Sequence, residues 1–170
     1  MLKIDRPRRL ITFSLLLLLI IFTAPMLSAC NEAESGKAAV VVEVLKRDTD
    51  EPVAQFKGDI VTSPEAQAKG LMHREAIADD YGMLFLFPQP DIARFWMKNT
   101  PIFLDMIFIT EAEITGEGKI SKIHENAIPF DEETQIASDQ PVIAVLEIKG
   151  GGAAEHNIAV GDRVRWTIKD

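Results

Sequence analysis

Beyond residue 38, the chain alternates between short apolar runs and clusters of turn-forming residues. The runs have the length of strands and are rich in β-branched and aromatic side chains, which favours β-structure over helix. Turn signals recur about every ten residues, as expected when successive strands fold back on one another. The pattern predicts strands at residues 39–46, 55–61, 82–87, 94–99, 102–109, 119–125, 142–149 and 162–169.

Two short helices are predicted among these strands. Ser63 provides an N-cap, Pro64 the first helical position and Glu65 an acid in the first turn, so a helix is expected over residues 64–72. A second short helix is expected within residues 151–159. The predicted fold class is therefore mainly β (α+β): a compact antiparallel β barrel or sandwich-like domain over residues 39–170, with two short helices.

Residues 1–29 have a different pattern and are predicted to be a signal peptide. Four basic residues precede the apolar run of residues 10–22, and small residues follow at Ser28 and Ala29, which is the order of a secretory signal. The alternative is an uncleaved membrane helix. A span requires about 20 predominantly apolar residues, and Thr12, Ser14, Thr23 and Pro25 weaken any window of that length.

Cys30, the single cysteine of the chain, is predicted to carry a lipid. The tetrad Leu27-Ser28-Ala29-Cys30 resembles a bacterial lipobox, in which the signal is cut before a cysteine that receives a diacylglyceryl group. The alternative is an unmodified cysteine at the exit of a signal. Residues 30–38 are small and polar, as in a flexible tether. We therefore expect an exported protein, lipid-anchored to the cell envelope on its periplasmic face, with inner and outer membrane both open.

The acidic charge of the chain opposes binding to nucleic acid. The formal net charge is −8, and removal of residues 1–29, with four basic residues and one acidic residue, makes it −11. Binding to nucleic acid requires basic surfaces that neutralise phosphates. The expected partners are instead the membrane, through the lipid on Cys30, and an unidentified small molecule or envelope protein.

The most unusual run is residues 95–108, which is apolar but carries Lys98 and Asp105. On a strand, Asp105 shares one face with Ile107 and Ile109, while Leu104, Met106 and Phe108 share the other. A strand that is apolar on both faces is usually buried on both, and an unpaired buried carboxylate is costly. Asp105 is therefore expected to find a partner. Lys98 and Asn99, across the turn at Pro101, are the first candidates, and Arg74 and Arg94 are the others.

Three readings of these polar residues stay open. In the first, the polar residues only stabilise the fold. In the second, they form a binding site at a polar pocket, with candidate residues Arg74, Trp96, Lys98, Asn99, Thr100 and Asp105. In the third, Lys98 and Asp105 serve a hydrolase-like acid/base enzyme. We favour a non-catalytic binding or accessory module and assign no catalytic residue.

Other chemistries find little support in the sequence. No serine lies in a Gly-x-Ser-x-Gly segment, and the glycine-rich motifs that cradle phosphates are missing. The three histidines, His73, His124 and His156, are far apart and form no paired motif. We therefore expect neither a metal nor a cofactor.

Several ordered segments resemble one known family, the domain of unknown function 192 family. These are GLMHR (residues 70–74), GMLFLF (82–87), FWMKNT (95–100), LDMIFI (104–109), AVLEIKGG (144–151) and VGDRV (160–164). The resemblance covers about residues 40–167 and implies a compact, mostly β domain of unknown activity. Its motifs carry polar residues at Arg74, Lys98, Asn99, Thr100, Asp105, Glu147 and Asp162. The segment 110–119 is longer than the turn expected there, and Ile136 stands where an aromatic residue would be usual.

Overall fold

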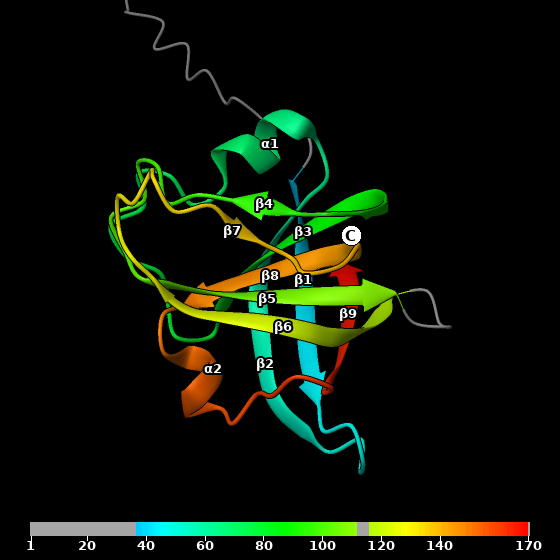
Figure 1. The fold of residues 1–170 in the computed structure, drawn as a ribbon. Coiled ribbons are helices and arrows are strands. Elements are labelled where there is room, and N and C mark those ends of the chain that lie inside the picture. The colour runs from blue at the N-terminus through cyan, green and yellow to red at the C-terminus, as the bar shows by residue number, and fades with distance from the viewer. Residues whose placement is uncertain (1–36, 112–115, 170) are drawn as a thin grey trace, which may run out of the picture. The chain divides into compact units, whose positions relative to one another are not determined.

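The computed structural model describes residues 37–111 and 116–169, and seven of its strands close into a barrel (Figure 1). Around the barrel the strand order is β1-β2-β3-β8-β5-β6-β9. These strands are β1 Lys37–Leu45, β2 Pro52–Val61, β3 Tyr81–Asp91, β5 Leu104–Glu111, β6 Glu117–Ala127, β8 Val142–Lys149 and β9 Arg163–Lys169. The predicted mainly β domain is confirmed. The predicted signal peptide and most of the tether lie outside the described residues, and β1 begins at Lys37, inside the predicted tether.

Six of the seven strand pairs around the barrel are antiparallel, and the pair β2–β3 is parallel. The parallel pair arises because residues 62–80, which include α1, carry the chain back before β3 starts. Gly58 on β2 faces Gly82 on β3, and a Cβ atom at Gly58 would lie 2.0 Å from the Gly82 carbonyl oxygen. The close approach of these two backbones therefore requires glycine at position 58.

Two short helices and a two-stranded sheet flank the barrel: α1 Pro64–Lys69, α2 Gly152–Glu155, β4 Arg94–Phe95 and β7 Ile136–Ala137. The Ser63 hydroxyl accepts a hydrogen bond from the Ala66 amide at 3.2 Å, so the predicted N-cap is confirmed. The helix ends earlier than predicted, because Gly70 adopts a positive φ of 46° after Lys69. The second predicted helix is α2.

The strand predicted over residues 94–99 is wrong beyond Phe95. The Met97 amide donates to the carbonyl oxygen of Asp131, and the Thr100 amide donates back to the Met97 carbonyl, which closes a turn. Asn99, inside that turn, has a φ of 53°. Local turn bonds therefore replace the strand ladder that the apolar pattern suggested.

The apolar side chains form two cores, one on each side of the barrel wall. All seven barrel strands contribute to the interior core, for example with Leu146 and Ile148 of β8. A second core lies on the outer face of β3, β8 and β5, where α1, β4 and β7 cover it. Two-sided burial was predicted for residues 102–109. It is confirmed from Leu104 on, since Ile107 belongs to the inner core and Met106 to the outer one, but it is wrong at Phe103, which precedes β5 and is 53% exposed. The candidate site lies in this outer core.

Candidate functional site

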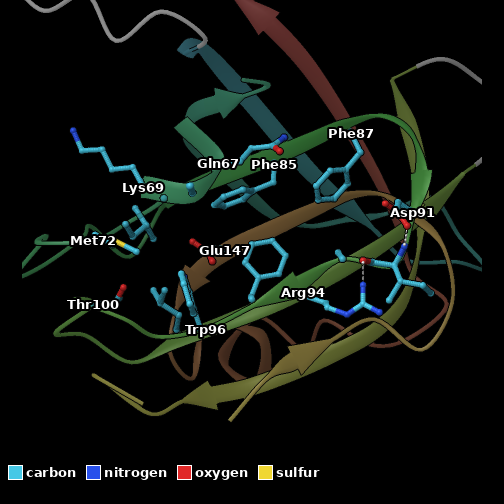
Figure 2. A pocket seen from close by; sticks show the side chains of 17 residues that line it. Gln67, Lys69, Met72, Phe85, Phe87, Asp91, Arg94, Trp96, Thr100 and Glu147 are labelled. Carbon is cyan, nitrogen blue, oxygen red and sulfur yellow. Dashed lines mark hydrogen bonds between the residues drawn. The ribbon is translucent and has the colours of Figure 1, made fainter. Parts of the chain in front are cut away.

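A cavity of about 320 Å³ opens on the outer face of the barrel. Its floor comes from β3, β8 and β5, and its walls come from α1, the residues after α1 and the segment around β4. The side chains drawn in Figure 2 are largely aromatic or aliphatic, and the lining includes Leu71, Met72, Phe85, Phe87, Phe95, Trp96, Thr100, Leu104 and Glu147. A mostly apolar cavity with a few polar groups is typical of a small-molecule site, and this volume is at the small end of the usual range.

Glu147 is a buried carboxyl group at this cavity, with only 4% of its surface exposed. Figure 2 shows the group in the space between Phe85 and Trp96. Its cross-strand neighbours are Met83 on β3 and Met106 on β5, and neither side chain can donate a hydrogen bond. Within residues 37–111 and 116–169, Glu147 has no hydrogen bond or ion pair. Burial raises the pKa of Glu147 to about 8.

The other polar side chains of the cavity are held by bonds elsewhere. The Gln67 amide donates to the carbonyl oxygens of Val61 and Leu86 at 3.3 and 3.0 Å. The Thr100 hydroxyl donates to the Lys98 carbonyl at 3.1 Å. Arg94, exposed at the rim, donates to the carbonyl of the nearby Ile92 at 3.3 Å. These bonds leave the buried carboxyl of Glu147 without a donor from the described cavity wall.

Two loops distant in sequence meet to form one side of the cavity. The amide of His73 donates to the carbonyl oxygen of Asn99 at 2.8 Å, and both residues have positive φ, 63° and 53°. This contact joins the GLMHR and FWMKNT segments, so that Met72 comes to line the same space as Trp96 and Thr100. A left-handed conformation is more accessible to asparagine than to most residues, which explains the tight loop at Asn99.

Of the six candidate binding residues, Trp96 and Thr100 line the cavity. Lys98 lies outside it: its side chain is 42% exposed, its Nζ atom is 3.9 Å from a carboxylate oxygen of Glu132, and it stands 5.4 Å from the centre of the Trp96 ring. Asn99 serves the loop contact, and its side-chain amide approaches the Met72 sulfur at 3.9 Å.

Arg74 also lies outside the cavity, in a small polar cluster. Its guanidinium donates to a carboxylate oxygen of Asp59 at 3.1 Å, and the Tyr81 hydroxyl donates to the same oxygen at 2.8 Å. The guanidinium stacks 5.0 Å from the centre of the Tyr81 ring. Burial and the bond to Asp59 raise the pKa of Tyr81. This arrangement ties the loop after α1 to the barrel and does not reach the site.

The predicted pairing of Lys98 with Asp105 is wrong. Asp105 is fully buried, but its partners are backbone amides, at Asn126 and Gly151 for one oxygen and at Ala153 for the other, at 2.8 to 3.0 Å. The side chain shares the inner face of β5 with Ile107, while the cavity lies on the outer face. The prediction that Asp105 has a partner is confirmed. Backbone amides can be that partner because a carboxylate accepts several N–H bonds at once.

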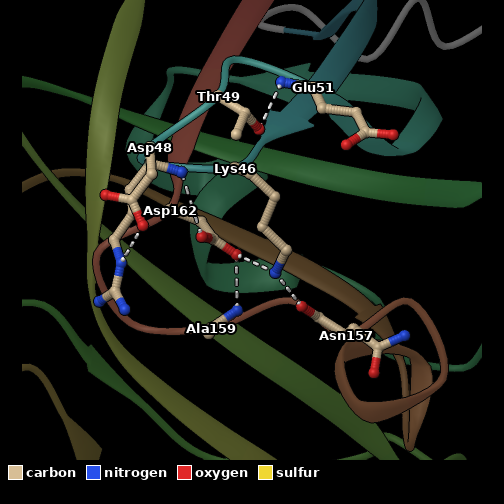
Figure 3. Close-up of polar contacts among 8 residues, drawn as sticks. Lys46, Asp48, Thr49, Glu51, Asn157, Ala159 and Asp162 are labelled. Atoms are coloured by element: carbon tan, nitrogen blue, oxygen red, sulfur yellow. Dashed lines mark hydrogen bonds and ion pairs between the residues drawn. The ribbon is translucent and has the colours of Figure 1, made fainter.

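Asp162 is a second buried carboxylate with structural partners (Figure 3). One oxygen lies 3.0 Å from the Lys46 ammonium and 2.9 Å from the Ala159 amide, and the other accepts the Arg47 amide at 3.4 Å. The end of β1 is thereby tied to the turn that precedes β9. Asp162 is not among the residues that line the cavity.

The described part of the chain lacks two features, a metal cluster and a membrane-spanning helix. No group of three or more His, Cys, Asp or Glu side chains there could hold a metal ion. None of the helices over residues 37–111 and 116–169 is long and apolar enough to cross a membrane. Cys30, the predicted lipidation site, lies outside the described residues.

Sequence reasoning did not select Glu147 as a site residue, although it lies in one of the segments that carry the family resemblance. The sequence nevertheless contained an indication that Glu147 is buried, because this residue stands between Leu146 and Ile148 in a strand that is apolar on both faces. This is the pattern that singled out Asp105. Five of the six segments quoted for the resemblance contribute lining residues, namely Met72, Phe85, Trp96, Leu104 and Glu147 among others. VGDRV, which contains Asp162, contributes none.

Fold and site together define a small β-barrel domain with a ligand-sized cavity outside the barrel. Residues 29–166 match the domain of unknown function 192 family, described as "Uncharacterized ACR", and the chain belongs to this family. The curated proteins contain no match.

Two solved structures are similar to the chain. One is a proposed transcription regulator from Sinorhizobium meliloti, with a TM-score of 0.68 and 33% identity, over 78% of this chain and 95% of that protein. The other is a protein of unknown function from Novosphingobium aromaticivorans, with a TM-score of 0.65 and 40% identity, over 74% of this chain and 84% of that protein. Both support the assignment of a small β domain.

Proposed function

We propose that this domain is a small-molecule binding module whose ligand enters the cavity and bonds to Glu147. The observation that carries the proposal is the unpartnered carboxyl group on the floor of a cavity whose lining is mostly aromatic and aliphatic. Burial of such a group is unfavourable unless it is hydrogen-bonded, and native proteins rarely keep one without a reason. A ligand that supplies the missing donor would relieve this penalty. The sequence led us to expect a polar pocket around Lys98, Asn99 and Thr100. We propose instead a site at Glu147, and of those three residues only Thr100 lines the cavity.

The test uses Trp96, which is 52% exposed and lines the cavity, as both reporter and target. The chain has two tryptophans, so Trp166→Phe leaves Trp96 as the only one. Fragments that change Trp96 fluorescence are then scored by the rise in melting temperature that they cause. A ligand at 100 times its Kd stabilises the folded state by about 2.7 kcal/mol.

Trp96→Ala should lose the stabilisation by these fragments. The matched control is Ile168→Ala, because Ile168 has the same exposed fraction, 52%, and lies on β9 away from the cavity. We expect Ile168→Ala to respond like the parent. The proposal fails if no fragment of a broad library binds, or if the fragments stabilise Trp96→Ala as much as the parent.

A second candidate, acid/base catalysis, now centres on Glu147. The earlier candidate pair, Lys98 and Asp105, lies on different sides of the barrel wall and is not proposed again. The raised pKa of Glu147, about 8, favours this candidate, because general acids and bases work best near the operating pH. Acid/base catalysis would need a second buried titratable group, which the described cavity wall lacks, so we rank this candidate below ligand binding. Turnover of ester or amide substrates that disappears in Glu147→Gln would establish it.

The envelope location also remains part of the proposal. Its support is the sequence: basic residues, an apolar run and small residues before the single cysteine, Cys30. A diacylglyceryl group suffices for stable attachment, since one acyl chain alone binds membranes only marginally. Mass spectrometry of the protein from a membrane fraction should find the lipid on Cys30, and Cys30→Ser should move the protein to the soluble fraction. An unmodified Cys30 would contradict the anchor.

Transcription regulation, the role named for the Sinorhizobium protein, is not part of our proposal for this chain, and we expect no binding to DNA. The formal charge of −8 opposes contact with phosphates. A gel-shift experiment with genomic fragments at low salt should show no complex.

A further inference from the structure

The cavity also indicates which ligand chemistry it would accept. Glu147 is flanked on its own sheet by two methionines, and the amide of Gln67 and the hydroxyl of Thr100 donate to backbone carbonyls. The ligand must therefore bring the donor. A cationic donor forms a stronger hydrogen bond to a carboxylate than a neutral one does.

The walls around this carboxyl are suited to a cation that carries an apolar group. Phe85 and Phe95 meet edge to face, with ring centres 5.1 Å apart, and both line the cavity with Trp96. Aromatic faces attract cations, and more strongly where water is excluded. Trp96 already has an ammonium group, that of Lys98, 5.4 Å from its ring centre. The cavity therefore combines a carboxyl group with aromatic faces.

An anion fits this arrangement poorly. Lys69 and Arg94 are at the rim of the cavity, but both are exposed, so water screens their charges. Glu147 lies deeper, at 4% exposure: in its neutral form it offers an anion no countercharge, and as a carboxylate it would repel one. A neutral donor would leave the carboxyl protonated and gain only an ordinary hydrogen bond.

Building on the proposed binding function, we propose that the cavity selects a small organic ammonium ion, whose N–H groups donate to the Glu147 carboxylate and whose apolar body packs against Phe95 and Trp96. The carboxyl proton leaves to solvent as the ammonium enters, so the site exchanges one cation for another. Binding is then coupled to the release of one proton, and its affinity depends on pH.

Three probes of matched size separate the ligand classes: benzylamine, as the ammonium ion, benzyl alcohol and benzoate. Isothermal titration calorimetry in buffers with different ionisation enthalpies counts the protons released. For benzylamine we expect about one proton released at pH 6.5, and an affinity that rises about tenfold per pH unit between pH 5 and 7. Benzyl alcohol should release none. Benzoate should bind at least tenfold more weakly than benzylamine at pH 7.

Glu147→Gln keeps the size of the side chain and removes its charge, and Glu155→Gln makes the same change at an exposed position on α2. We expect Glu147→Gln to bind benzylamine at least tenfold more weakly at pH 8 and without proton release, and Glu155→Gln to match the parent. If benzyl alcohol or benzoate binds at the cavity better than benzylamine, the ammonium inference is overturned while the binding function stands. If none of the three probes and no library fragment binds, both are overturned.

Discussion

The Oδ2 atom of Asp105 lies 2.8 Å from the amide nitrogen of Ala153, in the first turn of α2. The other oxygen accepts the amides of Gly151 and Asn126. One buried carboxylate on β5 thus binds both the start of α2, 48 residues later in the sequence, and the end of β6, 21 residues later. Asp105 therefore satisfies amides at the start of α2, as a helix cap does, although it lies on a neighbouring strand.

Asp105→Ala should strongly destabilise the domain. It leaves three amides without their acceptor, and each unsatisfied buried group costs about 1–3 kcal/mol. We expect a loss of about 3–5 kcal/mol in the free energy of unfolding, measured by urea denaturation. Asp80→Ala, at an exposed acidic residue, is the control and should lie within about 0.5 kcal/mol of the parent. A loss below 1 kcal/mol for Asp105→Ala would contradict this role.

Lys98→Met should be nearly neutral for stability. The Lys98 ammonium is 3.9 Å from Glu132, and both side chains are about half exposed, so the pair is worth less than about 1 kcal/mol. Chemical denaturation of the variant should therefore give a midpoint close to that of the parent. A loss of several kcal/mol would reveal a buried partner for Lys98 and restore the pairing that the sequence suggested.

The face of each residue on β5 could be predicted from the sequence, but not its partner. Asp105 and Ile107 fall on one face and Met106 on the other, because side chains alternate along any strand. The partners of Asp105 are amides at Asn126 and Ala153, whose positions depend on how distant turns fold. A charged side chain nearby in sequence was therefore a poor guide, since backbone donors carry no signature in a sequence.

For Glu147, the sequence pattern did not determine whether the side chain is buried. In VIAVLEIK, Glu147 and Lys149 alternate with apolar residues near the end of a strand, a pattern that also fits a face open to solvent. Glu147 is buried because α1 and the segment around β4 cover that face, whereas Lys149 on the same strand is exposed. The cover comes from residues 67–72 and 92–100, and its position follows from the strand order around the barrel, which the pattern did not determine.

Lys46→Met should destabilise the domain more than Lys98→Met does. Lys46 neutralises Asp162, which is 2% exposed, so its removal leaves a buried carboxylate with two amide partners only. Because the Lys46 side chain is about one-third exposed, we expect a loss of about 1–3 kcal/mol, below that for a fully buried pair. Urea denaturation of the two lysine variants side by side makes the comparison. Equal stabilities would contradict the structural role of Lys46.

Glu147 should make the stability of the ligand-free domain fall as the pH rises. The ordinary pKa of a glutamate is 4.5, and that of Glu147 in the folded protein is raised to about 8. Below pH 4.5 both states hold the proton, so Glu147 does not affect the equilibrium. Between these values the unfolded chain ionises and the folded one does not, so the free energy of unfolding falls by about 1.4 kcal/mol per pH unit. Above pH 8 the loss stays constant.

Glu147→Gln removes this dependence and leaves every other titrating group in place. Urea denaturation of parent and variant at pH 5 and pH 8 isolates the effect, because the other groups cancel in the difference. From pH 5 to pH 8, the variant should gain up to about 4 kcal/mol on the parent. Glu155→Gln, the surface control, should follow the parent within about 0.5 kcal/mol at both pH values. A difference between parent and Glu147→Gln that is the same at both pH values would mean that Glu147 is ionised in the folded domain, with a donor that its surroundings do not show.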